Sequence, residues 1–203
     1  MPEPAEPRGR RRLDVERRRA EILEAAELAF ADGAYGEVSA GEIAAASGSS
    51  TALVFHYFGT KAGLYGAVVE AAVERLRAAH DAAQAALPDG STARDRVAAS
   101  IAVYLDHIAT HPAAWAAPLR AGGEPAPAQE IRAAARAEYV ARLAGLLGVG
   151  EWPRHAYAVE GYFGFLDAAC LRWAERGCPT DERHALADAA LGALEGALGD
   201  WRV

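Results

Sequence analysis

Glycine and proline residues cut this sequence into segments of helical length, and this punctuation constrains the fold more than any other feature. The residues between the breaks are mostly alanine, leucine, glutamate and arginine, which favour helix, whereas strong strand formers are sparse. Apolar residues recur at helical spacing: Ile22, Ala26 and Phe30 share one face of a segment that Gly33 ends. The sequence therefore predicts an all-α protein with about nine helices and no strand. The expected helices span about 14–32, 39–47, 50–58, 60–87, 92–111, 113–120, 129–147, 153–176 and 180–201.

Apolar runs in the sequence are short. The hydrophobic fraction is 52%, much of it alanine, but no run reaches the roughly 18 residues that a membrane span requires. The start, "MPEPAEPRGRRRLDVERRR", lacks the apolar centre of a signal peptide. On a helix, Cys170 and Cys178 would lie about 12 Å apart, too far for a disulfide. We therefore expect a cytoplasmic protein without a disulfide framework.

Charge is distributed unevenly along the chain. The net charge is −7, which argues against a generally basic nucleic-acid-binding protein. Over residues 8–19, however, seven arginines stand against two acidic residues, whereas after Lys61 thirteen arginines stand against eighteen acidic residues. Residues 1–12 are expected to be disordered because three prolines precede a charged run. By charge alone, this segment is either a basic arm that meets a polyanion or a solvated tail.

One stretch, "SGSSTALVFHYFGTK" (47–61), concentrates hydroxyl groups, rings and the chain's single lysine. Before it, Ser39 and Glu42 have the spacing of a capping box, which starts a short helix that ends at Gly48. A second short helix follows Gly48-Ser49, and two short helices joined by such a turn make a helix-turn-helix. In this motif the second helix enters the DNA major groove with its N-terminal end.

The residue types along the second helix suit a DNA contact. Small side chains at its start permit close approach, and hydroxyl groups can donate or accept hydrogen bonds. Val54 and Phe58 are expected to face the core and to fix the angle between the helices. Similar spacing also occurs inside ordinary helical bundles, so spacing alone leaves both interpretations open. The residues expected at DNA are Ser50, Thr51 and Ala52 at the helix start, His56 and Tyr57 at the groove edge, and Lys61 at a phosphate.

The same region resembles the TetR-type transcriptional regulators. The resemblance is strong over 19–69, through "RAEILEAAELAFADGAYGEVS" and "AGEIAAASGSSTALVFHYFGTKAGLYGAVV". The later stretch "GFLDAACLRWAERGCP" is similar to the penultimate helix of many such regulators. The positions that match the family's pattern in register are Ser39, Glu42, Ile43, Ala44, Gly48, Ser50, Phe55, His56, Tyr57, Phe58, Thr60 and Lys61.

This resemblance implies a homodimeric regulator that binds an inverted-repeat operator in double-stranded DNA and is released by a small apolar or aromatic molecule; repressor is the default in the family. The expected organisation is an arm at 1–12, a helix-turn-helix domain at 13–61 and a ligand-binding and dimerisation domain at 62–203. The implied contacts are Ser39, Tyr57 and Lys61 to phosphates, Ser50, Thr51, Ala52 and His56 to the groove, and the arm arginines Arg10, Arg11 and Arg12 to the minor groove.

Two departures from the family's pattern bear on base recognition. Gly41 stands where many members carry a side chain that can read a base, and Ser49 replaces the usual valine of the turn. No arginine or lysine lies between Ser47 and Phe58, so the recognition helix lacks the commonest bidentate guanine contact. We expect modest direct readout, supplemented by DNA shape and the arginine arm.

The helix expected at 153–176 is apolar nearly all round. One stripe includes Tyr157 and Phe165, and another includes Phe163 and Leu166. Two apolar faces need two partners, which we expect to be the chain's own core and the same helix of a second subunit. The residues expected in this symmetric four-helix interface are Leu166, Cys170, Trp173, Leu186, Leu194, Leu198 and Trp201.

A ligand pocket is expected in the same part of the chain. Its expected residues are His107, His111, Trp115, Tyr139, Tyr162 and Phe165, an apolar set with a few polar groups, although ordinary core packing is the alternative for each. His107 and His111 lie four residues apart, but no third metal ligand is evident, so neither a metal nor another cofactor is expected.

An enzyme is the main alternative from another class of protein. The sequence contains no glycine-rich phosphate loop, nucleophile elbow, Cys/His metal set or obvious acid/base pair, so no catalytic residue is expected. A helical bundle without DNA binding, or a small-molecule-binding protein without a regulatory role, would leave the order of residues 39–61 unexplained.

Overall fold

The structure, a computed structural model, describes residues 8–121, 123–150 and 152–199, and every regular element in these ranges is an α-helix. The all-α fold predicted from the sequence is therefore confirmed. The helices are α1 (Arg8–Asp32), α2 (Ala40–Ala46), α3 (Thr51–Phe58), α4 (Lys61–Ala85), α5 (Ala93–Thr110), α6 (Pro112–Ala121), α7 (Ala126–Leu147), α8 (Pro153–Glu175) and α9 (Arg183–Leu198).

Three helix starts differ from the prediction by three residues or more. α7 begins at Ala126 rather than near residue 129, directly after Pro125. α1 begins at Arg8 rather than near residue 14, so the predicted disorder is wrong for residues 8–12. Arg17 supports this end of the helix, because its guanidinium lies within salt-bridge distance of Asp14 and Glu21 on the same face. α9 begins three residues after the predicted cap, because the carbonyl of Pro179 accepts a hydrogen bond from the amide of Glu182 and closes a turn there.

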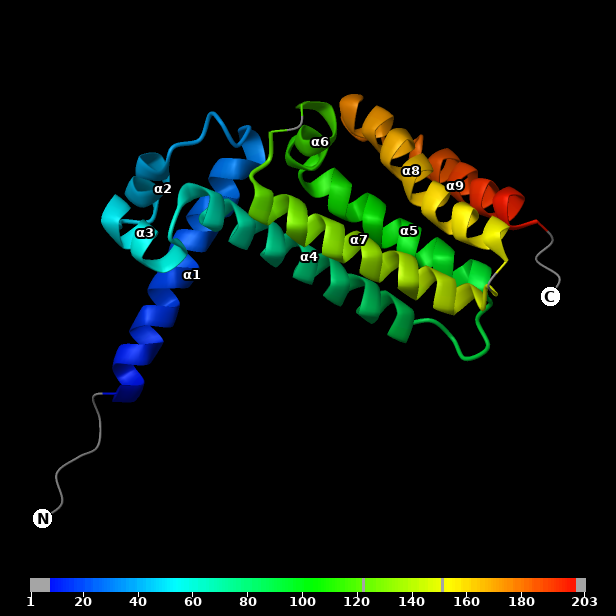
Figure 1. Cartoon of the computed structure of the whole chain (residues 1–203), viewed down its shortest axis with the longest axis horizontal. Helices are drawn as coiled ribbons and strands as arrows, with labels where there is room; N and C mark the ends of the chain where they lie inside the picture. Colours follow the sequence, from blue (N-terminus) through cyan, green and yellow to red (C-terminus); the bar gives the residue numbers. More distant parts are fainter. Residues whose placement is uncertain (1–7, 122, 151, 200–203) are drawn as a thin grey trace, which may run out of the picture.

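The helices form two groups that share α4 (Figure 1). α1, α2 and α3 lie at one end of the molecule, and α4 runs from them along the remaining helices. In the larger group α5 is central, since it packs against α4, α6, α7, α8 and α9. α8 and α9 pack against each other on the side of the bundle away from α4.

Each group of helices has its own hydrophobic core. The N-terminal core buries Ile22, Phe30, Ile43, Val54 and Leu64, which come from the first four helices. The predicted inward orientation of Val54 is confirmed. The larger core fills the space between α5, α8 and α9, and its buried side chains are Val97, Ile101, Leu105, Ile108, Ala116, Leu143, Val159, Tyr162, Leu166, Cys170, Trp173, Ala174, Ala190, Leu191 and Leu194.

α7 also contributes to the N-terminal core. Ala128 is fully buried in it, and Ile131 packs against it. A Cβ atom at Gly66 of α4 would lie 3.2 Å from the Cβ of Pro127, so the two helices approach closely at this point. The N-terminal group therefore packs against the larger group through α4 and α7, and α1 also packs against α6. No helix in the described part of the chain combines the length and apolar character needed to cross a membrane.

The junction between α3 and α4 depends on a glycine. Thr60 caps α4 by accepting a hydrogen bond from the amide of Gly63, at 3.0 Å. Gly59, at a φ of +75°, takes a backbone conformation that favours glycine. A Cβ atom on Gly63 would lie only 2.2 Å from the carbonyl oxygen of Phe58, so a larger residue could not hold the two helices at this angle.

Replacing Gly63 with alanine should lower the free energy of unfolding by about 1–3 kcal/mol, because the backbone must shift to admit the new methyl group. Gly145→Ala in α7 is the matched control, since its Cβ atom meets nothing within 4 Å and the change should stabilise the helix by about 0.5–1 kcal/mol. Urea unfolding followed by circular dichroism measures both changes, and equal effects of the two variants would contradict the close approach.

Candidate nucleic-acid interface and interior cavity

The α2–turn–α3 unit is held by its own capping hydrogen bonds. The hydroxyl of Ser39 accepts from the amide of Glu42 at 3.1 Å, while the amide of Ser39 donates to the carboxylate of Glu42 at 2.9 Å. Both hydrogen bonds of the predicted capping box are therefore present. Gly48 provides the positive φ, +60°, that the turn requires. Ser50 begins α3 by accepting from the amide of Leu53 at 3.2 Å.

α3 has one face in the core and one face in solvent. Val54 is buried and Phe58 is half-buried, whereas Thr51, Ala52 and His56 are exposed. Tyr57 is half-buried between these faces, with its ring centroid 5.4 Å from that of His56. The structure therefore brings the predicted groove residues onto one accessible surface, and it leaves the hydroxyl of Ser50 occupied by its capping bond.

The sequence interpretation missed Phe55, which matched the family's pattern but was not assigned to the surface. Its ring is 40% exposed although it lies on α3 beside Thr51 and Ala52. An exposed aromatic ring on a helix that already buries its neighbours suggests a contact surface. Phe55 follows Thr51 by four residues and so shares its helix face, and this spacing could have predicted that the ring is exposed.

Lys61 has partners within the chain. Its ammonium donates a hydrogen bond to the backbone carbonyl of Tyr35 and lies 4.4 Å from the centroid of the Tyr35 ring. The lone lysine therefore fastens the start of α4 to the loop between α1 and α2. Nothing in this arrangement tests the predicted phosphate contact, but the side chain is half-buried rather than extended into solvent.

The arginines of α1 differ in their surroundings. Arg17 and Arg18 lie near Glu21 on the same helix, which partly neutralises them. The guanidinium of Arg19 lies 4.9 Å from the centre of the Phe58 ring, so it helps to fix α1 against α3. The backbone of residues 10–12 is helical, but the side chains of Arg10, Arg11 and Arg12 lie outside the described part of the chain.

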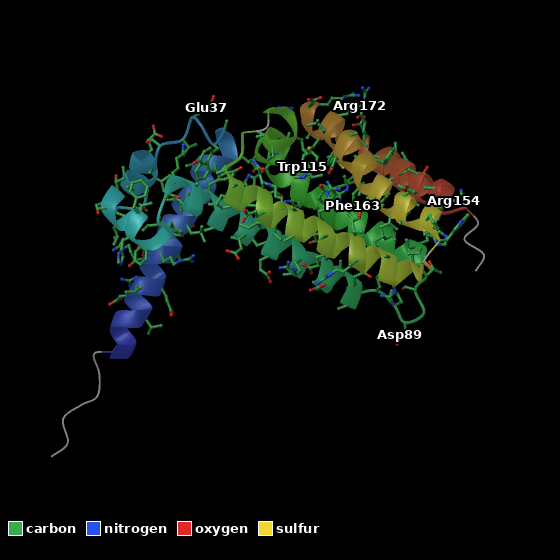
Figure 2. All side chains as sticks on the ribbon, in the orientation of Figure 1. Glu37, Asp89, Trp115, Arg154, Phe163 and Arg172 are labelled. Atoms are coloured by element: carbon green, nitrogen blue, oxygen red, sulfur yellow. The ribbon has the colours of Figure 1, made fainter. Side chains whose placement is uncertain are left out.

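A cavity of about 390 Å³ lies among α4, α5, α7 and α8, within the size range of small-molecule sites. Four residues of the predicted pocket line it, namely His107, Trp115, Tyr139 and Tyr162. Its lining also includes Phe163. Figure 2 shows Phe163 on α8 in the middle of the bundle and Trp115 near the α6 end. The hydroxyl of Tyr162 is buried and has no hydrogen-bond partner among the described residues.

Two predicted pocket residues do not line the cavity. His111 caps the end of α5 and is exposed, because the helix ends there and turns its side chain away from the bundle. Phe165 is 36% exposed, on the outer side of α8. Its neighbour Phe163 takes the expected place, because two residues along a helix rotate a side chain by more than half a turn.

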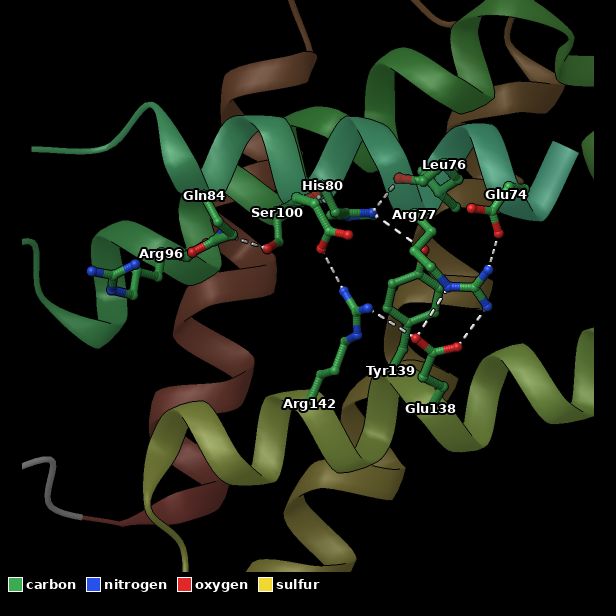
Figure 3. Close-up of polar contacts among 11 residues, drawn as sticks. Glu74, Leu76, Arg77, His80, Gln84, Arg96, Ser100, Glu138, Tyr139 and Arg142 are labelled. Carbon is green, nitrogen blue, oxygen red and sulfur yellow. Dashed lines mark hydrogen bonds and ion pairs between the residues drawn. The ribbon is translucent and has the colours of Figure 1, made fainter.

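A polar network joins α4 to α5 and α7 beside the cavity (Figure 3). The two ring nitrogens of His80 lie 2.9 Å from the carbonyl of Leu76 and 3.1 Å from the carbonyl of Ser100. Burial lowers the pKa of His80 despite these hydrogen bonds. The ring centroid of Tyr139 is 5.2 Å from that of His80. Gln84 adds a second bond to Ser100, at 3.1 Å.

Ion pairs connect α4 to α7 at the rim of this network. Arg77 forms a two-pronged bond with Glu138, at 3.1 and 2.6 Å, and Arg142 donates to Asp81 at 2.7 Å. Glu138 in turn holds the pKa of Arg77 above its ordinary value. Arg142 therefore has one acidic partner on each helix, Asp81 on α4 and Glu138 on α7.

His107 is uncharged at neutral pH. Burial, followed by the nearby charges of Arg75, Arg132, His111 and His80, lowers the pKa of its imidazole to about 4. The side chain therefore offers the cavity one hydrogen-bond donor and one acceptor. Within the described ranges, no group of three or more His, Cys, Asp or Glu side chains is placed to hold a metal ion.

The prediction for the dimer interface selected the wrong face of α8. Leu166, Cys170 and Trp173 are buried in the chain's own core, and so is Leu194 of α9. The inward face carries these bulkier side chains because they fill the space against α5 and α9. Leu186 and Leu198 are half-buried and pack against the same core, while Trp201 lies outside the described residues.

The outward face of α8 carries the other predicted stripe. Tyr157 is 80% exposed and Phe165 is exposed, and both lie on the side of α8 that none of the described helices covers. Gly161 and Gly164 lie between them, and a Cβ atom at either position would meet nothing within 4 Å. This face combines two aromatic rings with open space at its centre.

Residues 22–68 match the family model of bacterial regulatory proteins, tetR family. The match covers α1 from residue 22 onward, the whole α2–turn–α3 unit and the start of α4. Residues 22–68 therefore form a DNA-binding domain of the TetR type, and the protein is a DNA-binding transcriptional regulator.

Solved structures share this fold over most of the chain. A TetR-family transcriptional regulator from Streptomyces coelicolor has a TM-score of 0.72 at 23% identity, with 90% of this chain and 79% of that chain covered. A TetR-like regulator from Rhodococcus sp. RHA1 has a TM-score of 0.70 at 23% identity, covering 90% and 97%. The regulator FadR from Bacillus subtilis, in complex with stearoyl-CoA, has a TM-score of 0.68 at 18% identity, covering 89% and 99%. At these identities the likeness establishes the fold. No curated protein matches the sequence.

Removing the capping carboxylate should destabilise the TetR-type domain in a pH-dependent way. The hydrogen bonds from Ser39 lower the pKa of Glu42 below 4.5 in the folded state, so its contribution is present above that pH and is lost as the pH falls through the folded pKa. Glu42→Ala should therefore lower the melting temperature at neutral pH, and the difference from the wild type should shrink in acid. Glu130→Ala, at an exposed glutamate of α7, is the control; a pH-independent loss at Glu42 would contradict this account.

Proposed function

We propose that the protein is a homodimeric repressor that binds an inverted-repeat operator and is released by a small molecule in the interior cavity. The single observation that carries this proposal is the continuity of α4. Its first turns pack beneath α3, and its later residues Leu76 and His80 line the cavity. A ligand that shifts α4 would therefore change the position of α3, provided that it binds the two arrangements with different affinity.

We assign DNA contacts by chemical type. The exposed face with Thr51, Ala52 and His56 would enter the major groove, and Phe55 would add an apolar contact, such as one to a thymine methyl group. Backbone contacts would come from the α2 and α4 ends, at Ser39, Tyr57 and Lys61, with the arginines Arg10, Arg11 and Arg12 toward the minor groove. With so few base-reading groups, DNA shape would supply much of the specificity.

The outward face of α8 is the proposed dimer contact. Its two exposed rings, Tyr157 and Phe165, flank glycines that let a second helix approach closely. The exposed face of α9 is built from similarly small residues, including Ala189, Gly192 and Gly196. A two-fold pairing of these helices would present two copies of α3 to two half-sites of DNA.

The cavity is the proposed effector site. Apolar walls, the uncharged His107 and the unpartnered hydroxyl of Tyr162 offer a small molecule both burial and a few polar contacts. The Bacillus subtilis FadR structure contains stearoyl-CoA, which supports an effector role for a cavity in this fold.

Operator binding should depend on salt through Lys61. In fluorescence anisotropy with the DNA flanking its own gene, Lys61→Gln should reduce the slope of log affinity against log salt by about one, because one phosphate contact is lost. Arg94→Gln, which removes an ion pair with Glu195 far from α3, should leave the slope unchanged. An unchanged slope for Lys61→Gln would limit this lysine to its contact with Tyr35, and absence of specific DNA binding by the wild type would overturn the proposed function.

A charge on the outward face of α8 should separate the subunits. Phe165→Asp should raise the dimer dissociation constant about tenfold or more, because an unpaired carboxylate would be buried in the interface. Leu28→Asp on α1 is the control, since Leu28 is 67% exposed and lies outside the proposed contact. Analytical ultracentrifugation measures both, and an unaffected dimer in Phe165→Asp would place the interface elsewhere.

A further inference from the structure

The positive and negative charges of the side chains that line the cavity do not sum to zero. Arg136 pairs with Asp167, and Arg142 pairs with Asp81, so these four charges cancel within the wall. Arg132 also lines the cavity, but its carboxylate partner does not. The wall therefore carries one cation whose neutralising group lies outside it.

That partner is Glu124, which precedes α7. The Nε atom of Arg132 donates to both carboxylate oxygens of Glu124, at 3.1 Å each. The side chain of Glu124 is only 9% exposed. A carboxylate with so little access to water depends on its cation, because an unpaired charge in such a place is strongly destabilised.

Glu124 also contacts the N-terminal group of helices. The hydroxyl of Tyr65, in the second turn of α4, donates to the same carboxylate at 2.7 Å. Burial, followed by this hydrogen bond, raises the pKa of Tyr65 to about 12. The ring of Tyr65 lies against Phe30 and Tyr35, with centroids 4.9 and 5.2 Å away. The chain of contacts thus runs from the cavity wall through one carboxylate into the core beneath α3.

The rest of the cavity suits an apolar molecule. Ile101, Leu143 and Phe163 are among its apolar lining residues, and His107 adds an uncharged imidazole. A ligand that matched the whole site would place an apolar body against these walls and one negative charge at Arg132.

We propose that the effector is an apolar monocarboxylate whose carboxylate displaces Glu124 from Arg132. This inference rests on the proposed ligand-released repressor and specifies its ligand class and its coupling. The exchange leaves Arg132 paired and deprives the buried Glu124 of its cation, so Glu124 has to turn toward water or take up a proton. Either change weakens the hydrogen bond that Tyr65 donates to it. A neutral ligand can fill the cavity, but it cannot take over the role of Glu124.

Decanoate and decanol are suitable probes because they share an alkyl chain and differ in charge. In titration calorimetry with the full-length protein, decanoate should bind at least about tenfold more tightly than decanol, the ratio expected for a charge-assisted hydrogen bond. In DNA-binding anisotropy, decanoate should weaken operator binding by a factor of about five or more, and decanol should weaken it far less. Equal binding of the two probes would overturn the proposal.

Two variants separate ligand selection from coupling. Arg132→Gln should abolish the preference for decanoate over decanol while still binding decanol, which shows that the cavity is intact. Arg94→Gln is the matched control, because it removes an arginine–glutamate pair between α5 and α9 and should keep the preference. Tyr65→Phe should bind decanoate but reduce its effect on operator affinity. Retention of the full preference in Arg132→Gln, or of the full effect in Tyr65→Phe, would contradict the proposed exchange.

The failure of this proposal differs from a failure of the proposed function. Operator binding without a probe tests the repressor, whereas calorimetry on the protein alone tests the ligand class. A protein that binds its operator and ignores decanoate would remain a regulator with a different effector. A protein that prefers decanoate through Arg132 but binds no DNA would keep the ligand class and lose the repressor.

Discussion

Leu64, Tyr65 and Val69 complete the core beneath α3, and Leu76 and His80 of the same helix face the cavity. One continuous helix therefore belongs to both groups of helices, and neither group can be repacked without moving it. The close contacts at its start allow little play, because Gly63 lies against the last carbonyl of α3. A change in the packing of the bundle that moved α4 would therefore also move the residues that lie against α3.

The contacts that hold α4 to its neighbours have unequal strength. The exposed pairs that join α4 to α7, Arg77 with Glu138 and Asp81 with Arg142, contribute little, since water screens them. The buried His80 is harder to displace, because its ring would lose the hydrogen bond that it donates to one of the two backbone carbonyls facing it. α4 is consequently fixed against α5 near its middle by a buried side chain, and against α7 by the close approach at Gly66.

The local parts of the site were predictable from sequence because they depend on neighbours along the chain. The capping box of Ser39 and Glu42 and the inward side of Val54 follow from spacing alone. Spacing alone could not show which of the two apolar stripes of α8 packs inside, since periodicity reveals both faces without distinguishing them. Its outcome depends on volume: Trp173 fills a space against distant helices, whereas Gly161 could not.

Contacts between distant residues were also beyond prediction. Tyr65 and Glu124 are 59 positions apart, and no pattern in either segment indicates that they meet. Lys61 illustrates a related difficulty, because its match to a phosphate-contacting position gave no sign of its bond to the Tyr35 carbonyl. The sequence pattern indicated the phosphate as the partner of Lys61 and gave no information about the carbonyl of Tyr35.

The presence of two hydrophobic cores has a consequence for how this protein unfolds. Each core excludes water separately, and the two are joined by α4, by Ala128 and Ile131 of α7, by the packing of α1 against α6, and by the bond between Tyr65 and Glu124. Heat would melt them as one unit only if the free energy of that shared surface exceeds the difference between their individual stabilities. The sharpness of the melting transition therefore reports how tightly the two cores are coupled.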